Sequence, residues 1–272
     1  LIIIEVNLMD TIKVGDVEII AVSDGYGDMD PLTVFTDSSV EDWSHYPELM
    51  DDEGHIHPRF GTTVIRVRGK TIIVDTGLQG ADATLLEQLE EIGISPSQVD
   101  MVLITHLHPD HVGWNISDGK PTFRKATYYA PKLDWDYWTQ PEILENADHV
   151  KNQVIPLMND GQLVLMDKEF DVIPEISTLY SPGHTPGHTS FLITSNNECF
   201  VVLGDVAHTP AQAHHTDWNP IFDINGDLSR ETRNKLVTRF EEDNTLVSAG
   251  HFPYPGFGRF VMRNGRRTWT GV

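Results

Sequence analysis

The chain has 272 residues, of which 39% are hydrophobic and 22% are charged, a composition typical of a globular protein with one large domain or two small ones. Its 41 acidic residues outnumber 19 basic ones, and the formal net charge of −22 repels phosphate backbones, so a nucleic-acid partner is disfavoured. The sequence contains no run of about 18 apolar residues that could span a membrane, and its single cysteine excludes an internal disulfide.

The start of the chain and the single cysteine bear on its location. The sequence does not begin with Met, which leaves a removed signal peptide open. The acidic charge favours solubility, and we expect a cytoplasmic protein without membrane contact. Cys199 lies in the apolar run 199–203. We therefore expect a small buried hydrophobic residue there, and neither a nucleophile nor a metal ligand.

The N-terminal part predicts strands on either side of a long irregular segment. The alternating run from Val17 to Gly25 indicates a strand. Residues 62–68 and 71–75 predict a hairpin with its turn at Gly69-Lys70. Between these regions, residues 26–60 carry scattered proline, tryptophan and histidine with little regular pattern. A loop of this length in a compact domain favours a segment packed over a functional site.

A helix and a buried strand are expected next. Leucine and isoleucine recur at helical spacing between Asp82 and Ile92, and Gly93 is a typical residue for the C-terminal end of such a helix. Residues 99–104 are apolar and β-prone, which predicts a buried strand.

Four candidate metal ligands follow this strand: His106, His108, Asp110 and His111. In an extended backbone, side chains two positions apart share a face, so His106 and His108 can bind one metal ion together. Pro109 turns the chain, which lets Asp110 and His111 face a second ion. Imidazole and carboxylate groups suit zinc and neighbouring divalent metals. The alternative is a polar loop that is merely rich in histidine, but this pattern directly after an apolar strand favours a metal site.

A second pair of histidines has the same spacing. His55 and His57 lie within residues 26–60, with no apolar strand before them and no pattern of acidic partners. We therefore interpret this pair as surface or supporting residues.

The rest of the chain predicts further strands, two helices and a closing hairpin. The helices are expected at residues 132–140 and 229–243, with Ser229 as the N-cap of the second. Asn264-Gly265 indicates a type I′ turn between the last two strands. Because strands followed by a helix occur twice, we expect two packed sheets with helices outside them. The strands are expected at residues 126–130, 162–165, 176–180, 191–194, 199–203, 245–249, 260–263 and 266–270.

Polar residues also stand at the ends of three later strands. His184, Asp205 and His251 each follow an apolar strand and are flanked by glycine or proline. Loops that leave the same edge of a sandwich converge, so these residues can meet the earlier histidine cluster.

Together these motifs resemble the metallo-β-lactamase superfamily. The resemblance covers most of the chain and implies a layered α/β (α+β) fold, an αββα sandwich with a metal site at one edge of its sheets. It also implies a single hydrolase domain over residues 1–272. The motifs that carry it are Val74-Asp75-Thr76-Gly77, the His-x-His-x-Asp-His loop at residues 106–111, Gly183-His184-Thr185-Pro186-Gly187-His188, Gly204-Asp205 and Gly250-His251.

The resemblance implies two divalent metal ions per chain, with zinc as first choice and manganese, cobalt or iron tolerated by the same ligands. His188 and Asp75 are then expected to support the ligands through hydrogen bonds. The implied ligands are His106, His108 and His184 for one ion and Asp110, His111 and His251 for the other, with Asp205 bridging the two.

Within the superfamily, the chain looks most like N-acyl-homoserine lactonases and methyl-parathion-hydrolase-like enzymes. In the lactonases, a tyrosine three residues after the bridging aspartate helps to bind the substrate carbonyl, whereas this chain has His208 there. The stretch from Gly204 to Asp223 is more like the second group. His208 can donate a hydrogen bond to an oxyanion or a phosphoryl oxygen. A supporting or pocket-wall role for His208 is the alternative.

The activity implied is hydrolysis of a small-molecule lactone or carboxylic ester, such as an acyl-homoserine lactone or an aryl ester. A metal-bridging hydroxide would attack the carbonyl, and Asp110 would shuttle a proton to the leaving group. Residues 26–60 and Trp114 are our candidates for an apolar pocket wall. The aromatic residues from Trp135 to Trp138 are compatible with a homodimer.

Two other functions are weighed against this one. A phosphotriesterase is favoured by His208 in place of tyrosine. A non-catalytic metal-binding domain predicts a damaged ligand set, whereas every expected position is filled here. Class B β-lactamases fit less well because several use a cysteine at the position of Asp205. Glyoxalase II carries a C-terminal helical domain that this chain replaces with a hairpin, and the tRNA-processing nucleases conflict with the charge of −22.

Overall fold

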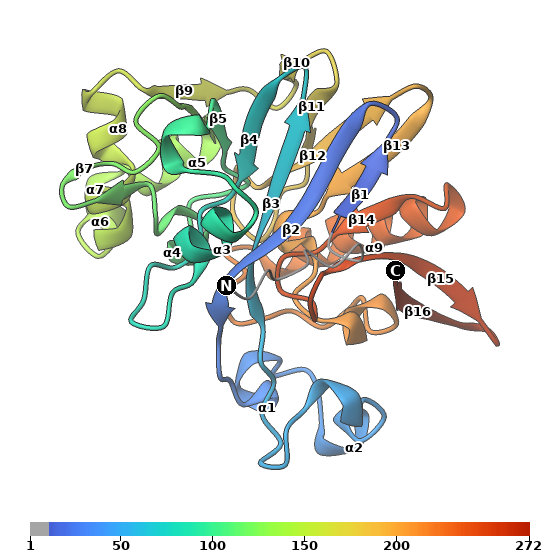
Figure 1. Ribbon diagram of the computed structural model, residues 1–272. Coiled ribbons are helices and arrows are strands. Elements are labelled where there is room, and N and C mark those ends of the chain that lie inside the picture. The colour runs from blue at the N-terminus through green and yellow to red at the C-terminus, as the bar shows by residue number, and fades with distance from the viewer. Residues whose placement is uncertain (1–10) are drawn as a thin grey trace, which may run out of the picture.

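Two seven-stranded β-sheets lie face to face in the computed structural model, which describes residues 11–272 (Figure 1). The first sheet has the order β1 (Thr11–Val14), β2 (Val17–Tyr26), β3 (Arg59–Val67), β4 (Lys70–Val74), β5 (Met101–Leu103), β8 (Thr127–Pro131), β9 (Leu163–Met166). The second has the order β10 (Asp171–Ile173), β11 (Ile176–Tyr180), β12 (Thr189–Ser195), β13 (Glu198–Val202), β14 (Leu246–Ser248), β15 (Phe257–Arg263), β16 (Arg266–Gly271). β6 (Ile116–Ser117) and β7 (Lys120–Pro121) form a separate hairpin.

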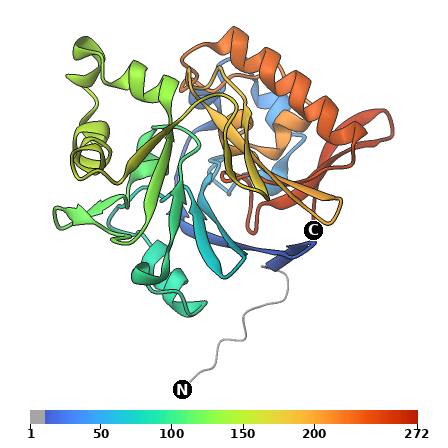
Figure 2. The ribbon, with the colours of Figure 1, turned by 90° about the horizontal axis from the view of Figure 1, so that it is seen from above.

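Helices cover the outer faces of both sheets, which gives four layers (Figure 2). The long helix α9 (Gly226–Glu242) lies on the second sheet, and shorter helices lie on the first. This is the αββα sandwich that the sequence predicts. No helix within residues 11–272 is long and apolar enough to cross a membrane. The helices on the first sheet are α3 (Leu85–Glu91), α5 (Lys132–Trp138), α6 (Pro141–Leu144), α7 (Asp148–Gln153) and α8 (Ile155–Asn159).

Three hydrophobic clusters hold these layers together. The cluster between the sheets joins side chains such as Ile65 and Ile72 of the first sheet to Phe191 and Phe200 of the second. The other two lie under the helices on either side. Trp135 and Trp138 pack against the cluster on the first sheet. Since packing accounts for these aromatic residues, they supply no argument for the homodimer, which stays a prediction.

Residues 27–58 form a small lobe at one end of the sheets (Figure 1). Far from being irregular throughout, this N-terminal lobe contains α1 (Pro31–Val34), α2 (Val40–Trp43) and the 3₁₀ turn η2 (Pro47–Leu49). The lobe has its own cluster, in which Phe35 and Trp43 pack against Trp218 from a distant loop. Sequence periodicity missed these helices because each is only one turn long.

Several predicted boundaries were wrong: α3 begins at Leu85 instead of Asp82, and β15 begins at Phe257 instead of Phe260. The hairpin turns at Arg68-Gly69, both with positive φ, and Lys70 already pairs with Val67. Helix α9 begins at Gly226 with Asn225 as its N-cap, three residues before the predicted start at Ser229. Asn225 is fixed there by a backbone hydrogen bond from its N–H to the oxygen of Gly183, a contact that the local sequence does not reveal.

The prediction for Cys199 was also wrong, because this residue is exposed. Cys199 lies near the start of β13, and the neighbouring strand β14 pairs with β13 only from Phe200 onward. Its side chain lies on the same face as Val201, which is buried under α9, but beside Arg239 and Asp243 at the C-terminal end of that helix, where the cover ends.

Candidate metal centre

The predicted ligands meet at one edge of the sandwich, and each lies in a loop, turn or one-turn helix that follows a strand. His106 and His108 follow β5, but the strand ends at Leu103, so the two histidines lie beyond the extended backbone that was expected for them. Pro109 begins a one-turn helix, α4 (Pro109–Val112), which carries Asp110 and His111. His184 follows β11, Asp205 lies in the 3₁₀ turn η4 (Gly204–Val206) after β13, and His251 follows β14.

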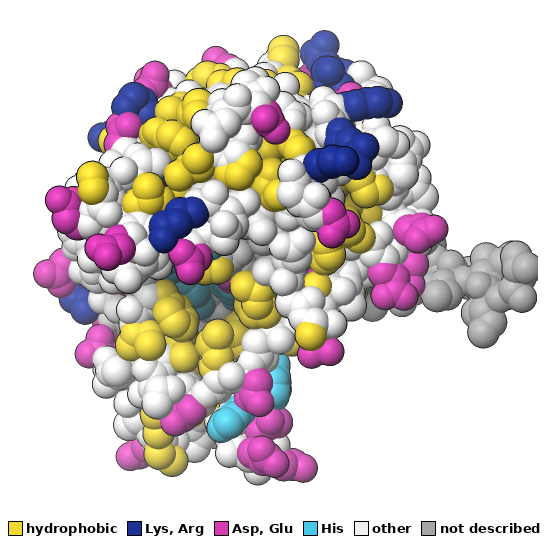
Figure 3. Space-filling model, turned by 90° about the vertical axis from the view of Figure 1, so that its left-hand side faces the viewer, with side chains coloured by type: hydrophobic (Ala, Val, Ile, Leu, Met, Phe, Trp, Pro, Cys, Tyr) yellow, Lys and Arg dark blue, Asp and Glu magenta, His cyan; other side chains and the backbone are white. Residues whose placement is uncertain are grey.

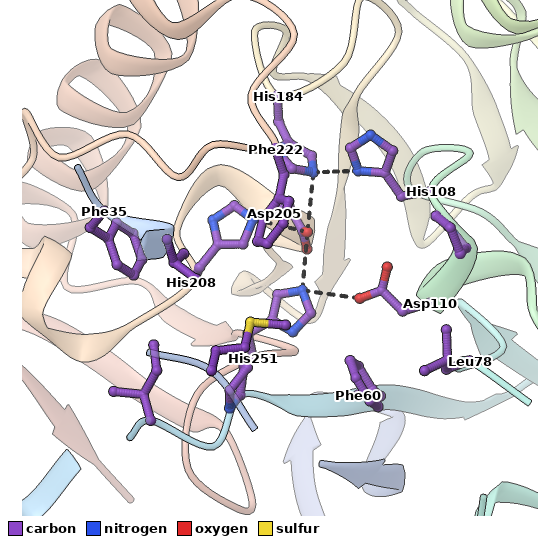
Figure 4. Close-up of a pocket in the computed structure, with 15 residues that line it drawn as sticks. Phe35, Phe60, Leu78, His108, Asp110, His184, Asp205, His208, Phe222 and His251 are labelled. Carbon is purple, nitrogen blue, oxygen red and sulfur yellow. Dashed lines mark hydrogen bonds and ion pairs between the residues drawn. The ribbon is translucent and has the colours of Figure 1, made fainter. Parts of the chain in front are cut away.

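The ring nitrogens and carboxylate oxygens of these residues form overlapping groups around Asp205 (Figure 4). His108 Nδ1 lies 2.8 Å from His184 Nε2. Asp205 Oδ2 lies 3.3 Å from His184 Nε2 and 3.0 Å from His251 Nε2. Within each group, the candidate ligand atoms lie within 4.8 Å of one another. The groups are His106, His108 and His184; His106, His111 and Asp205; Asp110, His111 and His251; and His184, Asp205 and His208.

Several of these atoms are buried without a hydrogen-bond partner. His106 Nε2, His111 Nε2 and Asp205 Oδ1 are in this state. Leaving buried polar atoms unpaired costs free energy, so their convergence on one point fits a cation. Imidazole nitrogens with carboxylate oxygens are the donor set of zinc and similar divalent ions. The residues present therefore fit two divalent ions, although the structure contains none.

The charges of the histidines agree with this fit. Burial lowers the pKa of His106 and of His108 well below the usual value, which keeps both imidazoles neutral, as a metal ligand must be. Burial also disfavours charge on His111 and His184, but nearby carboxylates outweigh it and raise both pKa values, to about 9 for His184. These carboxylates are Asp205 for both histidines, with Asp110 and Asp75 for His111 and Asp223 for His184. Asp205 thus favours positive charge around it. A metal cation bound beside Asp205 can replace the protons that would otherwise be held by His111 and His184.

Asp75 holds the loop that carries the first ligands. Its carboxylate accepts hydrogen bonds from the Thr105 N–H and from the Thr105 hydroxyl, both over 2.8 Å. It also lies 2.8 Å from His111 Nδ1. With Nδ1 engaged, Nε2 of His111 is left to face the centre. This is the supporting role expected for Asp75.

His188 supports the opposite side of the centre. Its Nδ1 donates to the carbonyl oxygen of Ser181 over 2.9 Å, and its Nε2 accepts from the Asp205 N–H over 2.8 Å. Burial lowers the pKa of His188 to about 3, so the ring is neutral and can make both bonds at once. His188 belongs to none of the candidate ligand groups found among the described residues.

Asp134 is a supporting residue that the sequence did not reveal. From α5 it accepts hydrogen bonds from the Leu107 N–H, the Thr185 hydroxyl and the Gly187 N–H, over 2.9, 2.9 and 2.6 Å. Burial raises the pKa of its carboxyl to about 6. Asp134 joins the two histidine loops, one from each sheet. Nothing in the local sequence distinguishes Asp134 from Asp136 on the same helix, which is exposed and pairs with Lys132.

Asp223 and Arg233 were missed as well. Asp223 Oδ1 lies 2.8 Å from His184 Nδ1, and its other oxygen lies 3.4 Å from Arg233 Nη2. Burial alone would raise the pKa of Asp223, but the hydrogen bond to His184 and the nearby positive charges lower it. Asp223 ends the stretch from Gly204 that resembles methyl-parathion-hydrolase-like enzymes, but a role was predicted for neither residue.

A cavity of about 380 Å³ opens beside the ligand groups. Figure 3 shows histidine side chains inside a hollow that is surrounded by hydrophobic side chains. Among the described residues, no lysine or arginine lines the cavity. Trp114 does not line it, contrary to our prediction, because its Nε1 donates to Asp24 and its ring packs on the first sheet. The apolar lining is Met29, Val34, Phe35, Ile56, Pro58, Phe60, Leu78, Pro109 and Phe222.

His208 lies in the cavity wall next to Asp205. Its ring is stacked on His251 at 5.3 Å, and its Nε2 lies 3.2 Å from Asp205 Oδ2. Burial lowers the pKa of His208 to about 4, so the ring is neutral. Both of its ring nitrogens are buried without a hydrogen-bond partner among residues 11–272.

The pair His55 and His57 lies on the N-terminal lobe, away from this centre. His55 contacts Asp28 and His57 contacts Asp51, all on the surface of the lobe. Neither histidine belongs to a candidate ligand group. The structure therefore agrees with the interpretation of this pair as surface residues.

Comparison with known proteins gives one family match. The sequence profile of the Metallo-beta-lactamase superfamily matches residues 62–251. The N-acyl homoserine lactonase of Bacillus cereus is 25% identical over 166 residues, which is 60% of each chain. The N-acyl homoserine lactonase AttM of Agrobacterium fabrum is 26% identical over 181 residues, covering 63% of this chain and 65% of that protein. The chain thus spans less than two thirds of the length of these curated relatives.

Two solved structures resemble the whole described chain. The hydrolase AbOPH of the beta lactamase superfamily has a TM-score of 0.89 at 26% identity, over 96% of both chains. AidC, a dizinc quorum-quenching lactonase, has a TM-score of 0.84 at 22% identity, again over 96% of both chains. The second likeness is one of fold alone.

Proposed function

We propose that this chain, which belongs to the metallo-beta-lactamase superfamily, is a dinuclear metal-dependent hydrolase of uncharged lactones or carboxylic esters. The observation that carries the proposal is the convergence of buried, unpaired histidine and aspartate atoms at the end of an apolar cavity. Lactonases among the relatives support the lactone as the substrate class.

The proposed ligands divide into two sets that share Asp205. Zinc is the first choice, because the donors are mainly imidazole nitrogens. When bound, two divalent ions would supply an activated water molecule and polarise the substrate carbonyl, whose carbon that water attacks. The sets are His106, His108 and His184 for one ion and Asp110, His111 and His251 for the other.

Asp110 and His208 are the proposed catalytic residues. Asp110 lines the cavity, and its Oδ2 lies 3.5 Å from His251 Nε2, so its carboxylate can reach both the proposed ion position and a substrate in the cavity. From there it can take up a proton and deliver it to the leaving oxygen. The neutral His208 ring can donate a hydrogen bond to the oxygen on which negative charge develops.

The cavity lining favours neutral substrates with an apolar group. A carboxylate or phosphate on the substrate would find no lysine or arginine among the described lining residues, while Asp110 and Asp205 would repel it. Phe35, Phe60 and Phe222 offer contact surface for an acyl chain or an aryl ring instead. Charged β-lactams and nucleic acids fit this cavity poorly.

A phosphotriesterase is the second candidate, and His208 favours it. In the position where the related lactonases are expected to place a tyrosine hydroxyl, the described cavity has this ring, and no tyrosine lines it. A neutral phosphotriester meets the same charge requirement as a neutral ester, and an imidazole can donate to a phosphoryl oxygen as well as to a carbonyl oxygen.

Parallel assays of the zinc-loaded protein separate the candidates. The substrates are an acyl-homoserine lactone, a p-nitrophenyl ester and a phosphotriester such as methyl parathion. We expect the highest kcat/KM with the lactone or the ester. Dominant turnover of the phosphotriester would move the assignment to the second candidate. A loaded protein that hydrolyses none of the three would contradict the proposal.

A further inference from the structure

A buried chain of polar contacts runs from one proposed ligand into helix α9. His184 Nδ1 and Asp223 Oδ1 lie 2.8 Å apart, and Asp223 Oδ2 lies 3.4 Å from Arg233 Nη2. The three side chains are 2%, 1% and 0% exposed, so solvent does not weaken these contacts. Asp223 does not line the cavity, and it therefore cannot touch a substrate held there.

Arg233 is fixed by the backbone around the site. Its Nε donates to the Val206 oxygen over 2.8 Å, directly after Asp205. Its Nη1 donates to the oxygens of Thr216 and Trp218, over 3.0 and 2.7 Å, and its Nη2 donates to the Ser229 hydroxyl over 3.0 Å. A guanidinium bonded on all sides has no freedom to move, so the position of Asp223 against it is fixed too.

The contact with Asp223 decides which nitrogen of His184 can bind a metal. A neutral imidazole carries one N–H and one lone pair. A carboxylate can only accept, so the proton of His184 must be on Nδ1 and the lone pair on Nε2. That lone pair is on the atom that lies 2.8 Å from His108 Nδ1 and 3.3 Å from Asp205 Oδ2. The carboxylate also increases the basicity of the ring, which strengthens a metal ligand.

We propose that Asp223, held in place by Arg233, is a positioning residue that fixes His184 as an Nε2 ligand and so sets the affinity of one of the two ion positions. The inference rests on the proposed function, because His184 is a ligand only if the centre binds metal. It adds a residue that is distant from the motif loops and outside the ligand groups found among the described residues.

The substitution Asp223→Asn tests this directly. The side chain keeps its size, but the two ends of the new amide differ: its oxygen can only accept a hydrogen bond and its NH₂ group can only donate one. Arg233 has only donors, so the amide oxygen will turn to Arg233 and the NH₂ group will face His184 Nδ1. Nδ1 must then be the acceptor, and the proton moves to Nε2, where it blocks the metal. We expect one zinc ion to bind with unchanged affinity and the other about 10- to 100-fold more weakly.

The measurement is competition of the metal-free protein for zinc against a chromophoric chelator, which needs no substrate. Asp223→Glu keeps the charge and acceptor oxygens and should recover most of the lost affinity. Ser229→Ala is the matched control, because it removes another partner of Arg233 without touching His184. It should lower thermal stability but leave both affinities unchanged.

The zinc-loaded wild-type protein provides a second test that does not depend on a variant folding. Its nitrogen-15 NMR spectrum should show His184 protonated at Nδ1 and metal-ligated at Nε2. Wild-type affinity at both positions in a folded Asp223→Asn protein, or ligation of His184 through Nδ1, would overturn the inference. Failure of the wild type to bind zinc would instead contradict the proposed function.

Discussion

The ligand loops and the wall of the cavity meet at one place but are built in different ways. The loops leave the ends of buried strands, and carboxylates such as Asp75 and Asp134 fix their backbones through short hydrogen bonds. Much of the wall comes from the N-terminal lobe, which is joined to the sandwich by ring contacts such as Trp43 to Trp218 at 5.3 Å. We infer that metal binding and substrate choice can be changed separately, because they depend on different contacts.

The largest effect is expected from removing a ligand in the loops. His106→Ala deletes a fully buried nitrogen that belongs to two of the candidate ligand groups. We expect loss of metal and of nearly all activity, because the water and the carbonyl are then no longer activated. Elemental analysis of the purified variant, with activity assayed in parallel, checks this. A variant that keeps its metal and turnover would remove His106 from the site.

A smaller loss is expected when the proposed proton shuttle is changed. Asp110→Asn keeps the size of the side chain but cannot take up a proton from the reaction. Turnover should fall by about 10²- to 10⁴-fold, which is the usual contribution of general acid–base catalysis, while the fold stays intact. Circular dichroism checks that the fold is intact, and steady-state kinetics at known metal content measures the fall in turnover. Full activity with metal bound would exclude the shuttle role.

A change in the wall should act on substrate choice alone. Phe60 lines the cavity beside His251, and Phe60→Ala removes apolar surface that a long acyl chain would cover. Loss of that burial should lower kcat/KM for long-chain esters by about 10- to 100-fold, with little effect on the shortest esters. The control is Val40→Ala, an exposed residue of the N-terminal lobe that does not line the cavity. Loss of zinc from the Phe60 variant would mean that wall and centre are not separable.

The smallest effect is expected at the second pair of histidines. His57 has the same spacing to His55 as His108 has to His106, but it lies at the surface with Asp51 as its partner. His57→Ala should therefore change neither metal content nor turnover. A drop of one metal ion per chain in this variant would show that the lobe, too, holds an ion.

The sequence was informative where the chemistry is local. His106, His108, Asp110 and His111 stand side by side in the chain, and apolar strands mark the positions from which the other ligand loops leave the sheets. The order of strands and helices was enough to predict the layered sandwich. These features depend on neighbouring residues, so a single sequence carries them.

Residues whose role depends on distant contacts were not predictable. Asp134, Asp223 and Arg233 look like ordinary helix or loop residues, and only the folded chain brings them to His184 and its loop. Trp114 was assigned to the wall, but its ring packs against the first sheet. Cys199 is exposed because the helix that covers this face of the sheet, α9, ends beside it at Arg239 and Asp243. In each case a partner far along the chain decides the outcome.

The most direct test of the account is the metal content of the purified wild-type protein. Elemental analysis after dialysis against metal-free buffer gives the number of ions per chain. The account predicts close to two, because two ligand groups with separate members meet at Asp205. A protein that holds no divalent metal, and takes up none when zinc is added, would contradict it.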